Sequence, residues 1–123
     1  MKQGFNIVIG GVAFQPDALE YSGCATPDVT VQKGNLLRGV PSNESFIEWD
    51  CWSEDFGGLD IITEAMDFIS ANKRGMEELG QARGVEYRRL NVVIAKDCCL
   101  ELTAANLTML ADIGVALSIV ILS

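Results

Sequence analysis

Glu48 and Asp50 are the two carboxylates whose spacing is best suited to chemistry. They lie two positions apart in a segment that alternates like a β-strand, so both side chains should point to one face. The rise of a strand separates them by about 7 Å, a spacing used by paired acid–base catalysts and by sites for hard metal ions. No D-x-D-x-D loop or cofactor motif surrounds them. The pair by itself therefore defines no reaction.

Histidine is absent from all 123 residues, and this limits the possible chemistry. Its absence excludes Ser-His-Asp and Cys-His catalysis and removes the usual general base near neutral pH. The four cysteines, Cys24, Cys51, Cys98 and Cys99, lack C-x-x-C spacing, which disfavours structural zinc. We expect reduced thiols, with Cys24 and Cys51 buried and one of the adjacent pair facing inward. The sequence predicts a protein that is not an enzyme and has no cofactor and no metal.

The negative charge is concentrated in one stretch of the chain. The formal net charge is −8, and no Lys or Arg lies between Arg38 and Lys73. Eight acids lie there: Glu44, Glu48, Asp50, Glu54, Asp55, Asp60, Glu64 and Asp67. They account for the whole excess, because the other nine acids balance the nine bases. Both tryptophans, Trp49 and Trp52, lie in the same stretch.

This stretch predicts a docking surface built from one strand face, the loop after it and one stripe of the next helix. Its residues are Glu48, Asp50, Trp52, Glu54, Asp55, Asp60, Glu64 and Asp67. Clustered negative charge steers a cationic partner, and an exposed tryptophan supplies contact area. The sign of the charge argues against direct binding of nucleic acid. The alternative interpretation is that the helix stripe is only a solvated face.

The periodicity predicts a single α/β domain over residues 1–123, with a mixed or mainly antiparallel sheet packed against two or three helices. Strands are predicted at 5–12, 28–32, 45–52, 86–96 and 115–122. Helices are predicted at 16–20, 59–72, 76–84 and 103–114, which makes the order β-α-β-β-α-α-β-α-β. The stretch 34–44 is predicted to be a loop.

Several finer expectations follow from the same patterns. Gly75 should separate the two central helices, and Thr103 should cap a helix that Gly114 closes. Inward-facing residues are predicted to be Ile47, Trp49 and Cys51 in one strand, Leu90, Val92 and Ile94 in another, and Ala104, Leu107, Leu110 and Ala111 in the last helix. The final strand is apolar on both faces, as in an interior strand or one at a packed interface.

No apolar run approaches the roughly 20 residues of a membrane-spanning helix. The first residues also lack the pattern of a signal peptide. We therefore expect a cytoplasmic protein without membrane association.

Two sets of motifs lie near the ends of the chain. The first is Phe14-x-Pro16-Asp17, followed by Gly23, Pro27 and Lys33-Gly34. The second runs from Leu102 through a capped helix and Gly114 to the L-x-I of the final strand, Leu117 to Ile119. Together they resemble a bacterial domain-of-unknown-function family of small α/β proteins. The resemblance implies a protein similar to the immunity partners of bacterial toxins, with no catalytic residues to transfer. The spacing from Gly23 to Pro27 and the paired tryptophans depart from the family pattern.

Three functions stay open at this point. The first, which we predict, is an immunity protein that neutralises a basic toxin, such as a nuclease domain, through the acidic and aromatic surface. The second is a small carboxylate-based enzyme or ligand-binding domain that uses Glu48 and Asp50. The third is a homodimeric housekeeping domain with Trp49 or Trp52 and an edge strand at its interface.

Overall fold

The computed structural model describes residues 3–16, 24–54 and 58–122, which form an open, mainly antiparallel sheet packed against three helices. Five strands form the sheet in the order β2-β5-β1-β6-β7. Their bounds are β1 (Gln3–Gly11), β2 (Val29–Val31), β5 (Ser45–Ser53), β6 (Tyr87–Ala95) and β7 (Ala116–Leu122). Only β6 and β7 pair in parallel; the other neighbours are antiparallel. The predicted α/β fold class is confirmed.

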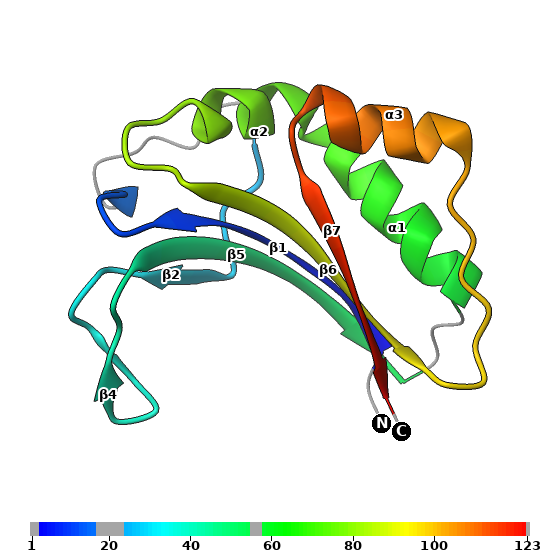
Figure 1. The fold of residues 1–123 in the computed structure, drawn as a ribbon, viewed down its shortest axis with the longest axis horizontal. Helices are drawn as coiled ribbons and strands as arrows, with labels where there is room; N and C mark the ends of the chain where they lie inside the picture. Colours follow the sequence, from blue (N-terminus) through cyan, green and yellow to red (C-terminus); the bar gives the residue numbers. More distant parts are fainter. Residues whose placement is uncertain (1–2, 17–23, 55–57, 123) are drawn as a thin grey trace.

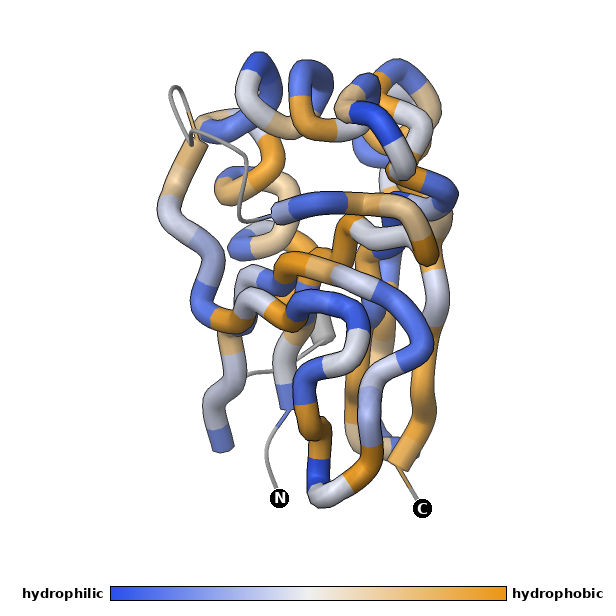
Figure 2. The backbone as a smooth tube through the Cα atoms, turned by 90° about the vertical axis from the view of Figure 1, so that its left-hand side faces the viewer, coloured by the Kyte–Doolittle hydropathy of each residue, from blue (hydrophilic) through white to orange (hydrophobic). Residues whose placement is uncertain are grey.

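The helices lie on one face of the sheet and leave the other face open. They are α1 (Gly58–Ala71), α2 (Lys73–Gly80) and α3 (Ala104–Asp112). The strands bow toward the helices, so the face away from them is concave (Figure 1). Figure 2 shows the same layering from the side, with the helices above the strands.

Strand alternation explains why one face is covered. In β1, Phe5, Ile7 and Ile9 point to the helices and are at most 2% exposed. The neighbouring strands add Ile47, Trp49, Leu90, Val92 and Ile94, and the helices add Ile61, Ile62, Ala65, Met66, Ile69, Met76 and Leu79. Burial of each large aliphatic side chain contributes about 1.5–3 kcal/mol. This apolar layer holds the helices on the sheet and confirms the inward faces predicted for these strands.

The break between α1 and α2 lies at Asn72, three residues before the glycine predicted to cause it. The Asn72 Nδ2 donates to the Phe68 carbonyl at 2.8 Å, and its Oδ1 accepts the Ala25 N–H at 2.7 Å. Gly75 is buried inside α2. The predicted end of this helix at residue 72 agrees with α1 to one residue, but the predicted cause is wrong, because the break falls at Asn72, whose side chain makes these two hydrogen bonds.

Residues 34–44, predicted to be a loop, contain a hairpin of β3 (Leu36–Leu37) and β4 (Val40–Pro41). The turn residues Arg38 and Gly39 both have positive φ, 52° and 80°, as a two-residue hairpin turn of the primed type requires. Arg-Gly is not among the usual sequence signals for that turn, which explains the missed prediction. The hairpin extends away from the helices (Figures 1 and 2).

The C-terminal region confirms one prediction and corrects two. Thr103 caps α3 through a capping box with Asn106, as predicted. In α3 Leu110 is buried, but Ala104, Leu107 and Ala111 are exposed, although all four were predicted to face inward. The strand β7 ends the sheet and is therefore not an interior strand. Because α3 contacts the sheet mainly at this last strand, it buries only a narrow side.

Three further predictions concern cysteines, the first helix and membranes. Cys98 packs against the core and Cys99 is exposed, as predicted for one of the pair, while Cys24 and Cys51 are half-buried and not fully buried. Of the helix predicted at 16–20, only Pro16 lies within the described residues. No helix in the described part of the chain is long and apolar enough to cross a membrane.

Candidate binding face

The concave face presents four rows of side chains that cross β5, β1 and β6. The register defines the rows as Phe46–Gly10–Tyr87, Glu48–Val8–Arg89, Asp50–Asn6–Asn91 and Trp52–Gly4–Val93. The three segments are distant in sequence, and only the pairing of β1 with both neighbours brings them together. We call these residues the concave face.

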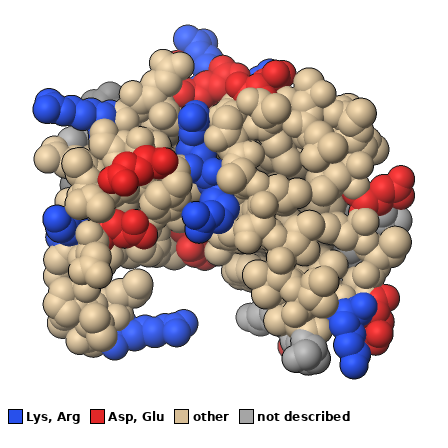
Figure 3. Space-filling model, in the orientation of Figure 1, with Lys and Arg blue, Asp and Glu red and all other residues tan. Residues whose placement is uncertain are grey.

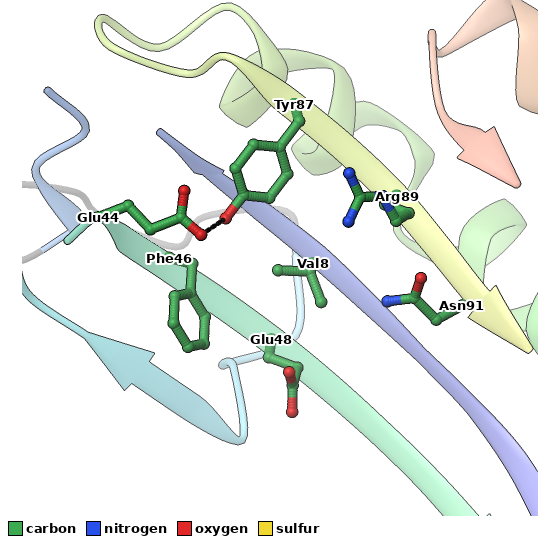
Figure 4. A pocket seen from close by; sticks show the side chains of 7 residues that line it. All are labelled: Val8, Glu44, Phe46, Glu48, Tyr87, Arg89 and Asn91. Carbon is green, nitrogen blue, oxygen red and sulfur yellow. Dashed lines mark hydrogen bonds between the residues drawn. The ribbon is translucent and has the colours of Figure 1, made fainter. Parts of the chain in front are cut away.

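A hollow of about 440 Å³ lies on this face. Its lining residues are Val8, Glu44, Phe46, Glu48, Tyr87, Arg89 and Asn91 (Figure 4). The carboxylates come from the β5 side, and the tyrosine, arginine and asparagine come from β6. The hollow therefore has acceptors along one wall and donors along the other.

Tyr87 reaches across β1 to Glu44, and Gly10 makes room for it. The Tyr87 hydroxyl donates to Glu44 Oε1 at 2.7 Å. A Cβ at Gly10 would lie 2.6 Å from the Tyr87 hydroxyl and 2.7 Å from the Ser45 carbonyl oxygen, so no side chain fits there. Burial, followed by the bond to Glu44, raises the pKa of Tyr87, which therefore stays protonated and donates. The Arg89 guanidinium lies 5.4 Å from the Tyr87 ring centre, within range of a cation–π contact.

Asp28, Glu48 and Asp50 crowd together where β2 meets β5, and we call them the carboxylate corner. The Asp50 N–H donates to Asp28 Oδ2 at 2.7 Å. Burial raises the pKa of Glu48 to about 7, helped by its hydrogen bond to Asp50 and by the charges of Asp50 and Asp28. The Asp50 Oδ1 is buried and has no hydrogen-bond partner within the described residues. Near neutral pH Glu48 is therefore only partly ionised, and it lies next to a buried carboxylate oxygen of Asp50 that has no hydrogen-bond partner among the described residues.

The corner does not have the geometry of a metal centre. In residues 3–16, 24–54 and 58–122, no group of three or more cysteine or acidic side chains is placed to hold a metal ion. What the corner can accept is a hydrogen-bond donor that also carries positive charge.

The structure divides the predicted site residues between two layers. On the concave face lie Glu48, Asp50 and Trp52, whose side chain is 38% exposed. Glu54 is exposed just after β5. Exposed positions of α1, in the layer on the other side of the sheet, hold Asp60, Glu64 and Asp67. Asp55 lies outside the described residues.

Glu64 is a member of the helix group whose charge reaches β5. Burial, and then the charges of Glu64 and Asp28, raise the pKa of the Cys51 thiol. Cys51 points toward the helices, so Glu64 approaches the edge of β5 from the covered side. The two groups of acids thus lie on either side of one strand.

Four residues near the carboxylates were not predicted from the sequence: Asp28, Tyr87, Arg89 and Asn91. The alternation of β6 could have identified three of them, because Tyr87, Arg89 and Asn91 occupy the face of this strand opposite its buried residues. Alternation does not say which strand lies beside β6. Only the order β5-β1-β6 places that face next to Glu48.

The β3–β4 hairpin stands at one end of the concave face and exposes aliphatic side chains. Leu36 is 72% exposed and Val40 is 65% exposed. Ser45, which is fully buried, anchors the segment before the hairpin: its Oγ accepts the Lys33 N–H at 2.7 Å. Figure 3 shows the surface hollowed between this hairpin and the opposite end of the strands. Exposed aliphatic groups of this kind are typical of interaction sites.

In comparisons with known proteins, no family model, no curated protein and no solved structure matches this chain. The resemblance to the bacterial family stays a prediction.

Proposed function

We propose that this chain is a protein-binding domain that holds a cationic segment of another protein on its concave face, as an immunity protein does when it neutralises a basic toxin. The observation that carries the proposal is the carboxylate corner. Burial, together with the neighbouring acids Asp50 and Asp28, raises the pKa of Glu48 to about 7, and Asp50 Oδ1 is buried without a partner among the described residues. A Lys or Arg side chain of a partner would supply the missing donor and offset the repulsion between carboxylates.

The dimensions of the face suit a chain segment. From Phe46 to Trp52 the rows extend over seven residues of β5, and the six steps between them span about 20 Å at the rise of a strand. An aromatic residue stands at each end, and the exposed aliphatic hairpin lies beside the first row. Aromatic anchors around a charged centre are the arrangement of a protein-binding surface. A partner with a Lys or Arg between two apolar side chains fits this pattern.

The direct test uses a labelled ten-residue peptide of alternating Lys and Leu as the probe, with fluorescence anisotropy as the readout. Glu48→Gln/Asp50→Asn should weaken binding by at least about tenfold, because these carboxylates contact the cation. The matched control, Asp60→Asn/Asp67→Asn on α1, changes the formal net charge equally and should weaken binding by less than about twofold. Equal losses in the two variants would mean diffuse attraction and would contradict the assigned face.

The pH dependence gives a second readout in the same assay. A bound cation favours the charged form of Glu48, so binding releases a proton when the carboxyl begins protonated. Affinity should therefore rise between pH 6 and pH 8, through the pKa of about 7. The Glu48→Gln variant should lose this rise.

The immunity role can be tested by expressing the protein that is encoded beside this one. That protein should be basic and should arrest growth, and co-expression of this chain should restore growth. The Glu48→Gln/Asp50→Asn variant should fail to protect, whereas the α1 control should protect. A harmless neighbouring product would contradict the immunity role and leave the binding face to be judged by the peptide assay.

The hollow favours one second candidate, a small-ligand site or carboxylate-based enzyme. A carboxyl with a pKa of about 7 suits general acid–base work, and Glu48 lines the hollow. A titration with benzylamine, monitored by the NMR shifts of the amides, distinguishes this candidate from protein binding. Saturable shifts confined to Val8, Tyr87 and Arg89 would favour a small ligand, whereas shifts along β5 produced only by the peptide favour protein binding.

A further inference from the structure

A second surface, far from the carboxylate corner in the strand order, carries almost no charge. From Thr103 to Leu122 the chain has a single charged residue, Asp112. This segment forms α3 and β7. The exposed residues of α3 other than Asp112 are Ala104, Ala105, Leu107, Thr108 and Ala111, which at about 100° per residue form one continuous side of the helix.

The strand β7 adds exposed aliphatic groups beside a free edge. The exposed fractions are 42% for Ile119, 47% for Val120 and 63% for Ile121. Sheet edges are usually protected by charged residues, proline or bulges, and Ala116–Leu122 contains no charged residue and no proline. Figure 3 shows uncharged side chains over α3 and β7, with charged ones at the margins. We call these residues of α3 and β7 the α3–β7 face; Ile119 and Ile121 lie on the helix side of β7, and Val120 lies on its open side.

We propose that two copies of this chain associate through the α3–β7 face, with their β7 strands paired antiparallel about a two-fold axis. A chain with a net charge of −8 repels a second copy over most of its surface, and this repulsion is weakest where charge is absent. An edge without charge therefore suits a second copy of this acidic chain.

The sequence of β7 is also complementary to itself. A two-fold interface places the same patch on both partners. With Ile119 opposite its own copy, Ser118 faces Val120 and Leu117 faces Ile121 of the second copy. Every such pair is uncharged, and opposed side chains in paired strands lie about 5 Å apart. The two sheets would then form one continuous sheet.

This arrangement leaves the concave face free. A two-fold axis between paired edge strands runs perpendicular to the sheet, so both helical layers stay on one side and both concave faces open on the other. The inference does not depend on the proposed binding of a cationic partner.

The test measures the mass of the full chain by sedimentation over about 1 to 200 µM, a range in which mass action reveals a dimer. Wild-type protein should approach twice the monomer mass, and about 0.5 M NaCl should not dissociate it, because salt screens charges and this face has almost none. Val120→Lys should weaken the dimer several-fold, because the two added lysines are diagonal neighbours across the two-fold axis and repel each other. The matched control is Val40→Lys on the exposed hairpin, which should leave the mass unchanged.

A mixing experiment tests the register. Ser118→Glu should also weaken self-association, but an equimolar mixture with Val120→Lys should restore a dimer, because residues 118 and 120 face each other across the axis. Thermal unfolding confirms that each variant is folded. A monomer at every concentration, or equal effects of Val40→Lys and Val120→Lys, would overturn the proposal. Failure of the mixture to restore the dimer would overturn the antiparallel register.

Discussion

The concave face and the α3–β7 face are two uncovered surfaces of the same sheet, and they differ in almost every property. The concave face has crowded carboxylates, a tyrosine held by Glu44 and a carboxyl whose pKa lies near 7. The α3–β7 face has exposed aliphatic residues and one charged residue in its whole segment. The first is suited to a charged partner and the second to a neutral one.

The difference shows that the position of a strand in the sheet determines the kind of surface it exposes, as much as its residue types do. Both β5 and β7 carry side chains on the open side of the sheet, but β5 has neighbours on both sides whereas β7 has one. A partner can therefore reach β5 only through its side chains, whereas β7 also exposes the backbone N–H and C=O groups of its free edge. Three substitutions separate the two faces.

Of the three substitutions, Gly10→Ala should lower the free energy of unfolding the most, and it should disturb only the concave face. Its Cβ would lie 2.7 Å from the Ser45 carbonyl oxygen, a backbone atom that cannot move away easily. We expect a loss of about 3 kcal/mol in the free energy of unfolding, measured in urea. Peptide binding should weaken, since Tyr87 loses its place, while self-association persists in the folded fraction. Ser70→Ala, at an exposed position of α1, is the control, and an unchanged stability of Gly10→Ala would mean that Tyr87 does not pack over β1.

Thr103→Ala should have an intermediate effect, confined to the α3–β7 face. It removes the side chain that accepts the Asn106 N–H at 3.1 Å, and loss of such a cap costs about 1 kcal/mol. Self-association should weaken because α3 loosens, and peptide binding should not change. Thr108→Ala in the same helix should change stability by less than about 0.5 kcal/mol. If both substitutions had the same effect, the capping box would not position α3.

Glu48→Gln should have the smallest effect, and its sign depends on pH. The pKa of Glu48 rises from 4.5, the ordinary value of a glutamate carboxyl, to about 7 in the folded protein, so folding favours the protonated form. The stability that this proton provides is present below pH 4.5 and is lost as the pH rises through 7. The variant stays neutral, so its melting temperature should match that of wild type at about pH 4 and exceed it at about pH 8. The gain should stay below about 1 kcal/mol because the carboxyl is partly solvated.

Glu64→Gln on α1 is the control for this pH profile and should parallel wild type. A profile of Glu48→Gln that also parallels wild type would show that the carboxylate corner does not hold a shifted proton. That result would remove the main support for a cationic partner.

Some features of this protein follow from local sequence. Strand alternation predicted that Ile47 and Trp49 point inward while Glu48 and Trp52 point to the open side, because successive side chains of a strand alternate by geometry. The N-cap at Thr103 was predictable for a similar reason, since a capping box needs only residues three apart. The absence of histidine is also settled by the sequence alone.

Other features depend on which strands are neighbours. The pairing of β1 with both β5 and β6 joins segments that are far apart in the sequence, and it is what brings Tyr87 to Glu44 and places Arg89 across from Glu48. The same order makes β7 an edge, and the layering puts Asp60 and Glu64 on the covered side of the sheet. Backbone hydrogen bonds between strands are the same for every residue type, so strand order is decided by packing of the whole chain and not by any short segment of it.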